Sequence, residues 1–93
     1  MPRFKVAHLH ELGQDMVIVP LEPDFGNKTE SAQQQIIADL QAHSVAAGLR
    51  GTVVPVWLSG RRMMFIAPQP WHPFFTNLDI NTVLRNVNKE LFW

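Results

Sequence analysis

The sequence predicts an α+β domain in which two strand–strand–helix units follow one another, ββα and then ββα. Hydrophobic residues make up 46% of the 93 residues and charged residues 17%, enough apolar mass for one core and too little charge for a disordered chain. Apolar runs at 16–19 and 63–67 each follow a glycine turn and each end at prolines, as strands do. A segment with helical spacing of apolar residues follows each proline-bounded loop.

The first unit begins with an alternating segment, residues 4–11, and a turn at 13–15. The short turn predicts an antiparallel hairpin with strand 16–19. After a loop at 22–29, residues 30–47 carry a helical stripe formed by Ile36, Ile37, Leu40 and Ala47. Thr29 or Ser31 can cap the start of this helix, and Gly48 is its natural end.

The second unit repeats this plan. Residues 52–58 are rich in β-formers but contain Pro55, which predicts an edge strand or a bulge because proline has no N–H to donate. A turn at 59–61 leads into strand 63–67. The last helix is predicted from a stripe that continues almost to the end of the chain and consists of Ile80, Val83, Leu84, Val87 and Leu91.

The two halves, 1–49 and 50–93, therefore form a pseudo-repeat within one domain spanning 1–93. Pairing the two hairpins gives a four-stranded, mainly antiparallel sheet with both helices on one face. Strands 16–19 and 63–67 are apolar on both sides, and no third helix is predicted to cover the second face. We therefore expect a second copy of the chain, or another protein, to cover it.

Composition narrows the partners and the compartment. Eight basic residues balance eight acidic ones, so there is no strong attraction to nucleic acid or to an anionic membrane. The chain has no cysteine, which favours a reducing compartment. No leader-like or membrane-spanning apolar run is present. We expect a cytoplasmic, bacterial-like protein without a cofactor, since no phosphate-binding glycine motif occurs.

The richest candidate for partner binding is the loop 68–75. Its three prolines stiffen it, and Trp71, Phe74 and Phe75 concentrate aromatic area around His72, as in recognition anchors. The same rings could instead form a lid that fills the core, and both roles stay open. Arg61 and Arg62 mark the tip of the second hairpin as an anchor for an anionic group, or as a solvated tip.

Two histidines suggest a weaker, chemical alternative. His8 and His10 lie two residues apart on a predicted strand, so both face one side, as half of a metal site would. His72 or His43 could complete such a site, with Glu11 or Asp15 as the carboxylate. No serine lies in a nucleophile motif.

The leading expectation is thus a small, non-catalytic, self-associating protein-interaction module with no metal. The alternative is a small-ligand or metal-assisted enzyme that uses His8, His10 and His72. A weaker alternative is single-stranded nucleic-acid binding on the sheet, with stacking on Trp57, Phe65 or Phe4.

Overall fold

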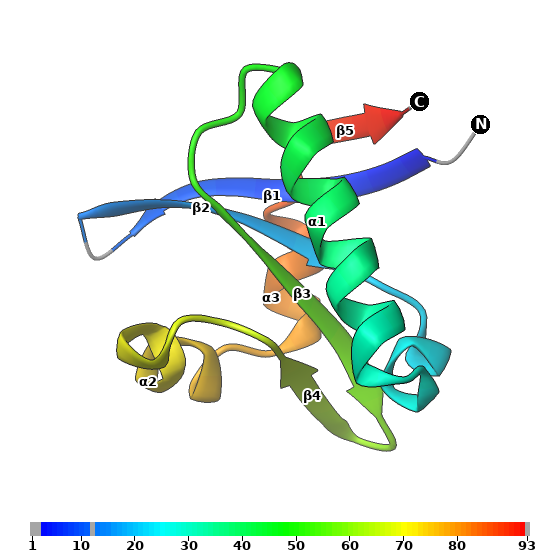
Figure 1. The fold of residues 1–93 in the computed structure, drawn as a ribbon. Coiled ribbons are helices and arrows are strands. Elements are labelled where there is room, and N and C mark those ends of the chain that lie inside the picture. Colours follow the sequence, from blue (N-terminus) through cyan, green and yellow to red (C-terminus); the bar gives the residue numbers. More distant parts are fainter. Residues whose placement is uncertain (1–2, 12, 93) are drawn as a thin grey trace.

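The computed structural model describes residues 3–11 and 13–92, residue 92 by its backbone alone, and contains five strands and three α-helices (Figure 1). In chain order the elements are β1 (Arg3–Glu11), β2 (Gln14–Pro20), the 3-10 turn η1 (Pro23–Asn27), α1 (Glu30–Ala46), β3 (Thr52–Ser59), β4 (Arg62–Phe65), the 3-10 turn η2 (Gln69–Trp71), α2 (His72–Thr76), α3 (Ile80–Arg85) and β5 (Lys89–Phe92).

The α+β class is confirmed, but the sheet differs from the expected one. It has five strands in the order β4-β3-β2-β1-β5, and β2 and β3 are parallel while the other pairs are antiparallel. The expectation of four mainly antiparallel strands was therefore wrong in detail. The 17 residues of α1 span about 25 Å at 1.5 Å per residue, long enough to return the chain to the start of β2 before β3 begins.

The end of the chain departs most from the expected repeat, because the predicted helix stops at Arg85 and the chain returns as strand β5. Asparagine is a poor residue for a helix interior and favours turns, and two asparagines flank Val87. The side chain of Asn88 accepts a hydrogen bond from the N–H of His8 (2.9 Å) and donates one to its carbonyl (3.1 Å). The amide of the Asn88 side chain thus bonds to His8 as the backbone of a paired strand residue would. Strand β5 begins at the next residue and pairs with β1.

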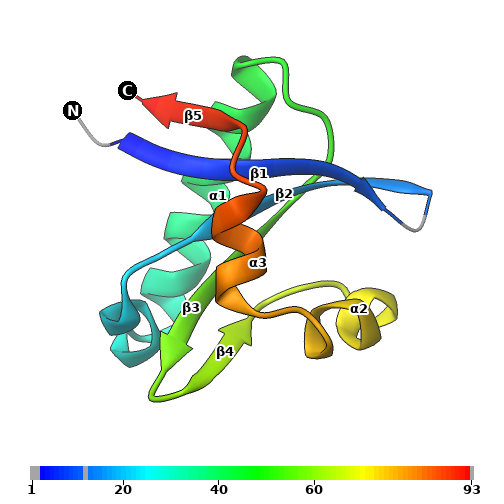
Figure 2. The same cartoon turned by 180° about the vertical axis from the view of Figure 1, so that it is seen from behind.

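Helices lie on both faces of the sheet, as the front and back views show (Figures 1 and 2). One face packs against α1 through a cluster of buried apolar residues: Val6, Val17, Val19, Leu40, Leu49, Val53 and Leu91. The opposite face packs against η2, α2 and α3 through a second cluster: Ala7, Met16, Ile18, Val54, Val56, Trp71, Phe75 and Val83. The expectation of both helices on one face, with the other face bare, was wrong.

Pro55 lies in β3, an interior strand of the sheet, and not in the edge strand or bulge that its presence predicted. The carbonyl of Pro55 accepts a hydrogen bond from the N–H of Ile66 (3.2 Å), so the backbone of Pro55 faces the β4 side. Strand β4 has already ended at Phe65. The missing N–H therefore removes no hydrogen bond between β3 and β2, and proline is tolerated in this interior strand.

Candidate functional site

An apolar cleft opens where β2 ends while β1 and β3 continue on either side. The chain leaves β2 at Pro20 and turns into η1. Strands β1 and β3, which flank β2, diverge toward this side of the molecule (Figure 1). The cleft has a volume of about 860 Å³. Its lining is Arg3, Phe4, Lys5, Pro20, Leu21, Glu22, Pro23, Asp24, Phe25, Lys28, Ile36, Leu58, Ile80, Leu84 and Glu90.

Its position follows from the topology. Strands β2 and β3 run parallel, and both of their carboxyl ends lie at the cleft. In sheets with parallel strands, crevices outside these ends commonly receive ligands, because neighbouring connections leave in different directions there. Here β2 connects to α1 on one face, while β3 turns into β4 and the chain then crosses to α2 and α3 on the other face.

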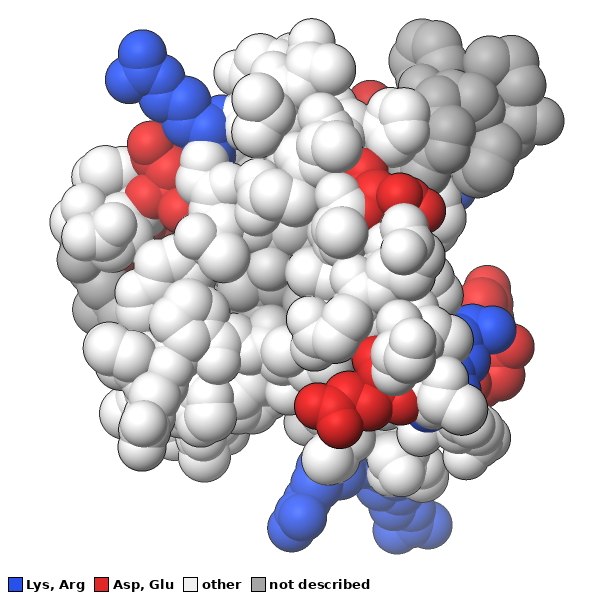
Figure 3. Space-filling view, in the orientation of Figure 1, with Lys and Arg blue, Asp and Glu red and all other residues white. Residues whose placement is uncertain are grey.

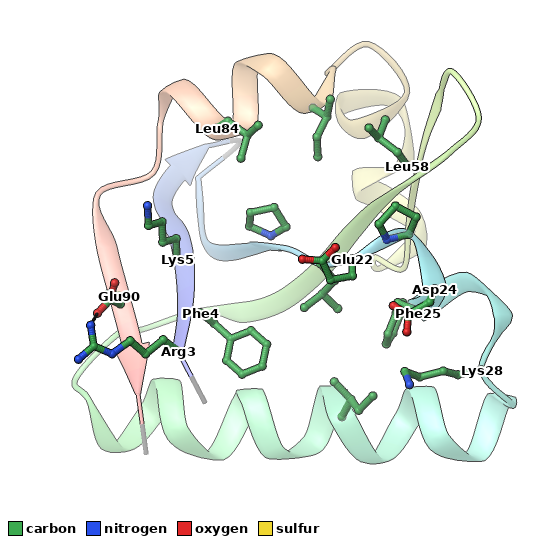
Figure 4. Close-up of a pocket in the computed structure, with 15 residues that line it drawn as sticks. Arg3, Phe4, Lys5, Glu22, Asp24, Phe25, Lys28, Leu58, Leu84 and Glu90 are labelled. Carbon is green, nitrogen blue, oxygen red and sulfur yellow. Dashed lines mark ion pairs between the residues drawn. The ribbon is translucent and has the colours of Figure 1, made fainter. Parts of the chain in front are cut away.

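Apolar side chains from both helical layers form the walls (Figure 4). Ile36 belongs to α1, and Leu84 belongs to α3 on the opposite side. Leu84 is 53% exposed, which is costly for a side chain of this kind and leaves apolar area available to an occupant.

One end of the cleft is formed by the rigid contact between Phe25 and Trp57. Their rings meet edge to face with centroids 4.9 Å apart. A Cβ on Gly26 would lie 2.6 Å from Nε1 of Trp57, so only glycine permits this approach without rearrangement. The Phe25 ring is thereby fixed as part of the wall before anything binds.

Charged residues of both signs surround the opening. Arg3 and Glu90 are 3.9 Å apart in an exposed ion pair, an arrangement that contributes little to stability. The remaining charges of the lining are Lys5, Lys28, Glu22 and Asp24. Seen over the α1 face, charged residues form small separate groups and no basic stripe (Figure 3). This rim does not select for a strongly charged ligand.

The predicted aromatic loop serves the core more than the surface. Trp71 and Phe75 are buried, and Phe74 is half-buried with its ring edge to face against Phe75, centroids 5.1 Å apart. For Trp71 and Phe75 the lid arrangement is therefore the one observed. His72 is exposed and its Nε2 lies 2.9 Å from the carbonyl of Ala67.

The arginines of the hairpin tip lie apart from the apolar cleft. Arg61 and Arg62 are exposed and line a second, more polar hollow of about 780 Å³, together with His72. Partner binding by the exposed residues of the predicted set stays a prediction.

The histidines do not assemble into the predicted site. Nε2 of His8 lies 2.8 Å from the carbonyl of Arg50, while Nδ1 of His10 lies 2.7 Å from Oδ1 of Asp15. The hydrogen bond from His10 holds the pKa of the Asp15 carboxyl below its ordinary value. Within residues 3–11 and 13–92, no three histidine, aspartate or glutamate side chains are grouped so that they could hold a metal ion.

The cleft could not be predicted from local sequence patterns. Its walls come from positions as far apart as Phe4, Ile36, Leu58 and Leu84, and only the sheet order brings them together. The one local signal is Pro20, which marks the place where strand pairing must stop.

Comparisons of the chain with protein-family models, with curated proteins and with solved structures found no match. No helix in the described part of the chain is long and apolar enough to cross a membrane. Any functional assignment therefore depends on the geometry of the cleft.

Proposed function

We propose that this protein is a small, non-catalytic interaction module that binds apolar groups of a partner in the cleft between α1 and α3. The observation that carries the proposal is an apolar cleft of about 860 Å³ at the carboxyl ends of two parallel strands, lined by residues of the described part of the chain. Clefts of this size, mainly apolar with a few polar groups at the edge, are typical of binding sites.

The lining residues favour binding over catalysis. Among the described residues, the lining contains no histidine, serine, threonine, cysteine or tyrosine, so it offers no hydroxyl or thiol nucleophile beside a histidine base. Its carboxylates stand at the charged rim, where Glu90 is already paired with Arg3. The exposed His10–Asp15 pair does not line the cleft.

Self-association was expected because one face of the sheet was predicted to be bare. Both faces are covered within one copy, so this reason for self-association no longer holds. Of the three rings expected to stack on nucleic-acid bases, Trp57 is buried and Phe4 and Phe65 are partly buried. The cleft is the partner surface that the proposal uses.

Binding of the fluorescent dye 1-anilinonaphthalene-8-sulfonate tests the proposal. We expect the wild-type protein to bind the dye, and Leu84→Gln to weaken that binding by about fivefold or more, since losing part of a buried leucine contact costs on the order of 1 kcal/mol. Val45→Gln is the matched control, because Val45 is 64% exposed on α1 and does not line the cleft.

Circular dichroism of both variants separates loss of the site from loss of the fold. Equal weakening by Leu84→Gln and Val45→Gln, or no dye binding by the folded wild-type protein, would show that the cleft is not a binding site.

A further inference from the structure

Strand β1 presents the backbone of Arg3 and Lys5 to the cleft. The Val6 carbonyl accepts a hydrogen bond from the N–H of Asn88 (3.1 Å), and the N–H and carbonyl of His8 bond to the Asn88 side chain. Even-numbered residues of β1 therefore direct their backbone groups toward β5. Because backbone direction alternates along a strand, Arg3 and Lys5 direct theirs the opposite way, toward the line of β2.

Strand β2 leaves the Lys5 carbonyl without a donor. Its pairing with β1 ends at Ala7 and Ile18, and the same register places Pro20 opposite Lys5. Proline has no N–H, so it cannot donate to the Lys5 carbonyl. The register places Glu22 opposite Arg3, beyond the end of β2, and no hydrogen bond joins their backbones in the part of the chain that the structure describes.

The Lys5 carbonyl and the backbone groups of Arg3 thus form an open stretch of strand edge inside an apolar cleft. On its other side the same residues pair antiparallel with β5, so their backbone already has the extended geometry that pairing needs. An open edge of this kind is a template for another extended chain. It differs from an edge in solvent because Ile36 of α1 and Leu84 of α3, from the two opposite helical layers, line the same cleft.

Resting on the proposed function, we infer that the occupant of the cleft is an apolar, extended polypeptide segment of a partner protein that pairs with Arg3 and Lys5 as an added strand. Alternating N–H and carbonyl groups in an extended chain match the open groups of β1, as in other strand-addition complexes. Residues 3–5 span about 10 Å, so about three residues of the partner pair there. Both faces of the added strand are covered, which requires a continuous apolar run.

A blocked pentapeptide, acetyl-TVIVT-amide, is a suitable probe because its centre is apolar and β-branched. We expect it to displace the dye from the wild-type protein and to slow hydrogen exchange at the Arg3 amide by about tenfold or more. Leu84→Gln weakens its binding, and Val45→Gln does not.

Two N-methylated forms of the peptide decide whether its backbone pairs. One carries N-methyl groups at the second and fourth residues, and the other at the third alone. In a paired strand only alternate N–H groups face β1, so we expect one form to lose about tenfold or more in affinity while the other retains binding.

The outcomes separate this inference from the proposed function. Equal affinity of both methylated forms and the parent peptide, or dye binding without peptide binding, overturns the added strand and leaves an apolar small-molecule site. Absence of both dye and peptide binding overturns the two proposals together.

Discussion

The side chain of Gln41 joins α1 to an unpaired edge of the sheet, and replacing it should destabilise the protein measurably. Its Nε2 donates to the Gly51 carbonyl (3.0 Å), and its Oε1 accepts from the N–H of Val53 (2.9 Å). Val53 is buried and precedes Val56, where pairing between β3 and β4 begins. Gln41 therefore satisfies a buried N–H that no neighbouring strand reaches.

The expected cost of Gln41→Ala follows from these two bonds. A net hydrogen bond contributes about 0.5–1.5 kcal/mol, and a buried donor left without a partner costs about 1–3 kcal/mol. Alanine is the better helix former, which returns a few tenths of a kcal/mol. We expect a loss of about 2–3 kcal/mol in the free energy of unfolding, a large share of the roughly 5–15 kcal/mol typical of a domain.

Urea denaturation of Gln41→Ala beside Gln35→Ala measures this difference. Gln35 lies on the same helix and bonds only to the exposed carboxylate of Asp39, so its replacement should change the free energy of unfolding by less than about 0.5 kcal/mol. Exchange of the Val53 amide should quicken only in Gln41→Ala. Similar stabilities for the two variants, or an unchanged Val53 exchange rate, would refute the role assigned to Gln41.

Three other perturbations have defined outcomes. Gly51→Ala should destabilise the protein by more than about 2 kcal/mol in thermal unfolding, because Gly51 has φ +119° and a Cβ would lie 2.4 Å from the Asp15 carbonyl oxygen. Gly48→Ala is the control, since Gly48 has φ +81° but open space around it, and it should cost only about 1–2 kcal/mol. Equal losses of stability in the two variants would contradict the role of crowding at Gly51. Asn88→Ala should cost about 1–2 kcal/mol by removing two hydrogen bonds to β1, with faster amide exchange in β5 as the readout; unchanged exchange would show that β5 holds without it. His10→Ala should raise the pKa of Asp15 toward its ordinary value in an NMR titration, because the His10 hydrogen bond lowers it. A carboxyl with a lowered pKa stabilises the fold above its ordinary pKa, and this contribution is lost as the pH falls through the lowered pKa, so the stability of the variant should depend less on pH in the acid range. An unmoved Asp15 pKa would contradict the pairing.

Local signals were sufficient for the first four strands and the first helix. The turns at Gly13 and Gly60 have positive φ, as expected of glycine turns, and Thr29 caps α1 by accepting from the Ala32 N–H (3.1 Å). Each of these features depends on residues only a few positions apart, so it can be predicted from a local sequence pattern.

The last fifteen residues show why the rest could not be predicted. Val87 and Leu91 fit a helical stripe, yet Leu91 reaches the core from strand β5. Four-residue spacing is compatible with both structures. What decides between them is the bond from Asn88 to His8, eighty positions away, which no local pattern records. The helices lie on opposite faces because α1 joins the neighbouring strands β2 and β3 across one face, whereas α2 and α3 lie in the connection that crosses the other face from β4 to β5. The expected binding surface is thereby covered, and a cleft is found instead.

The cleft was hidden for a related reason. Leu84 was assigned to the buried stripe of the last helix, but with α1 and α3 on different sides of the sheet it lines an open space instead. Proline at position 20 was read as the end of a strand, which is correct. That the strands on both sides of it continue depends on the sheet order.

Pairing between β1 and β5 joins residues 3–6 to residues 89–92. During synthesis, residues 3–6 can complete this pairing only after residues 89–92 have been made, more than eighty positions later. A nascent chain halted before residue 89 cannot form it, so the edge of β1 that faces β5 is open as well. Such a chain, held on the ribosome, should bind strand-like peptides or chaperones that the finished protein, with that edge closed, binds less well.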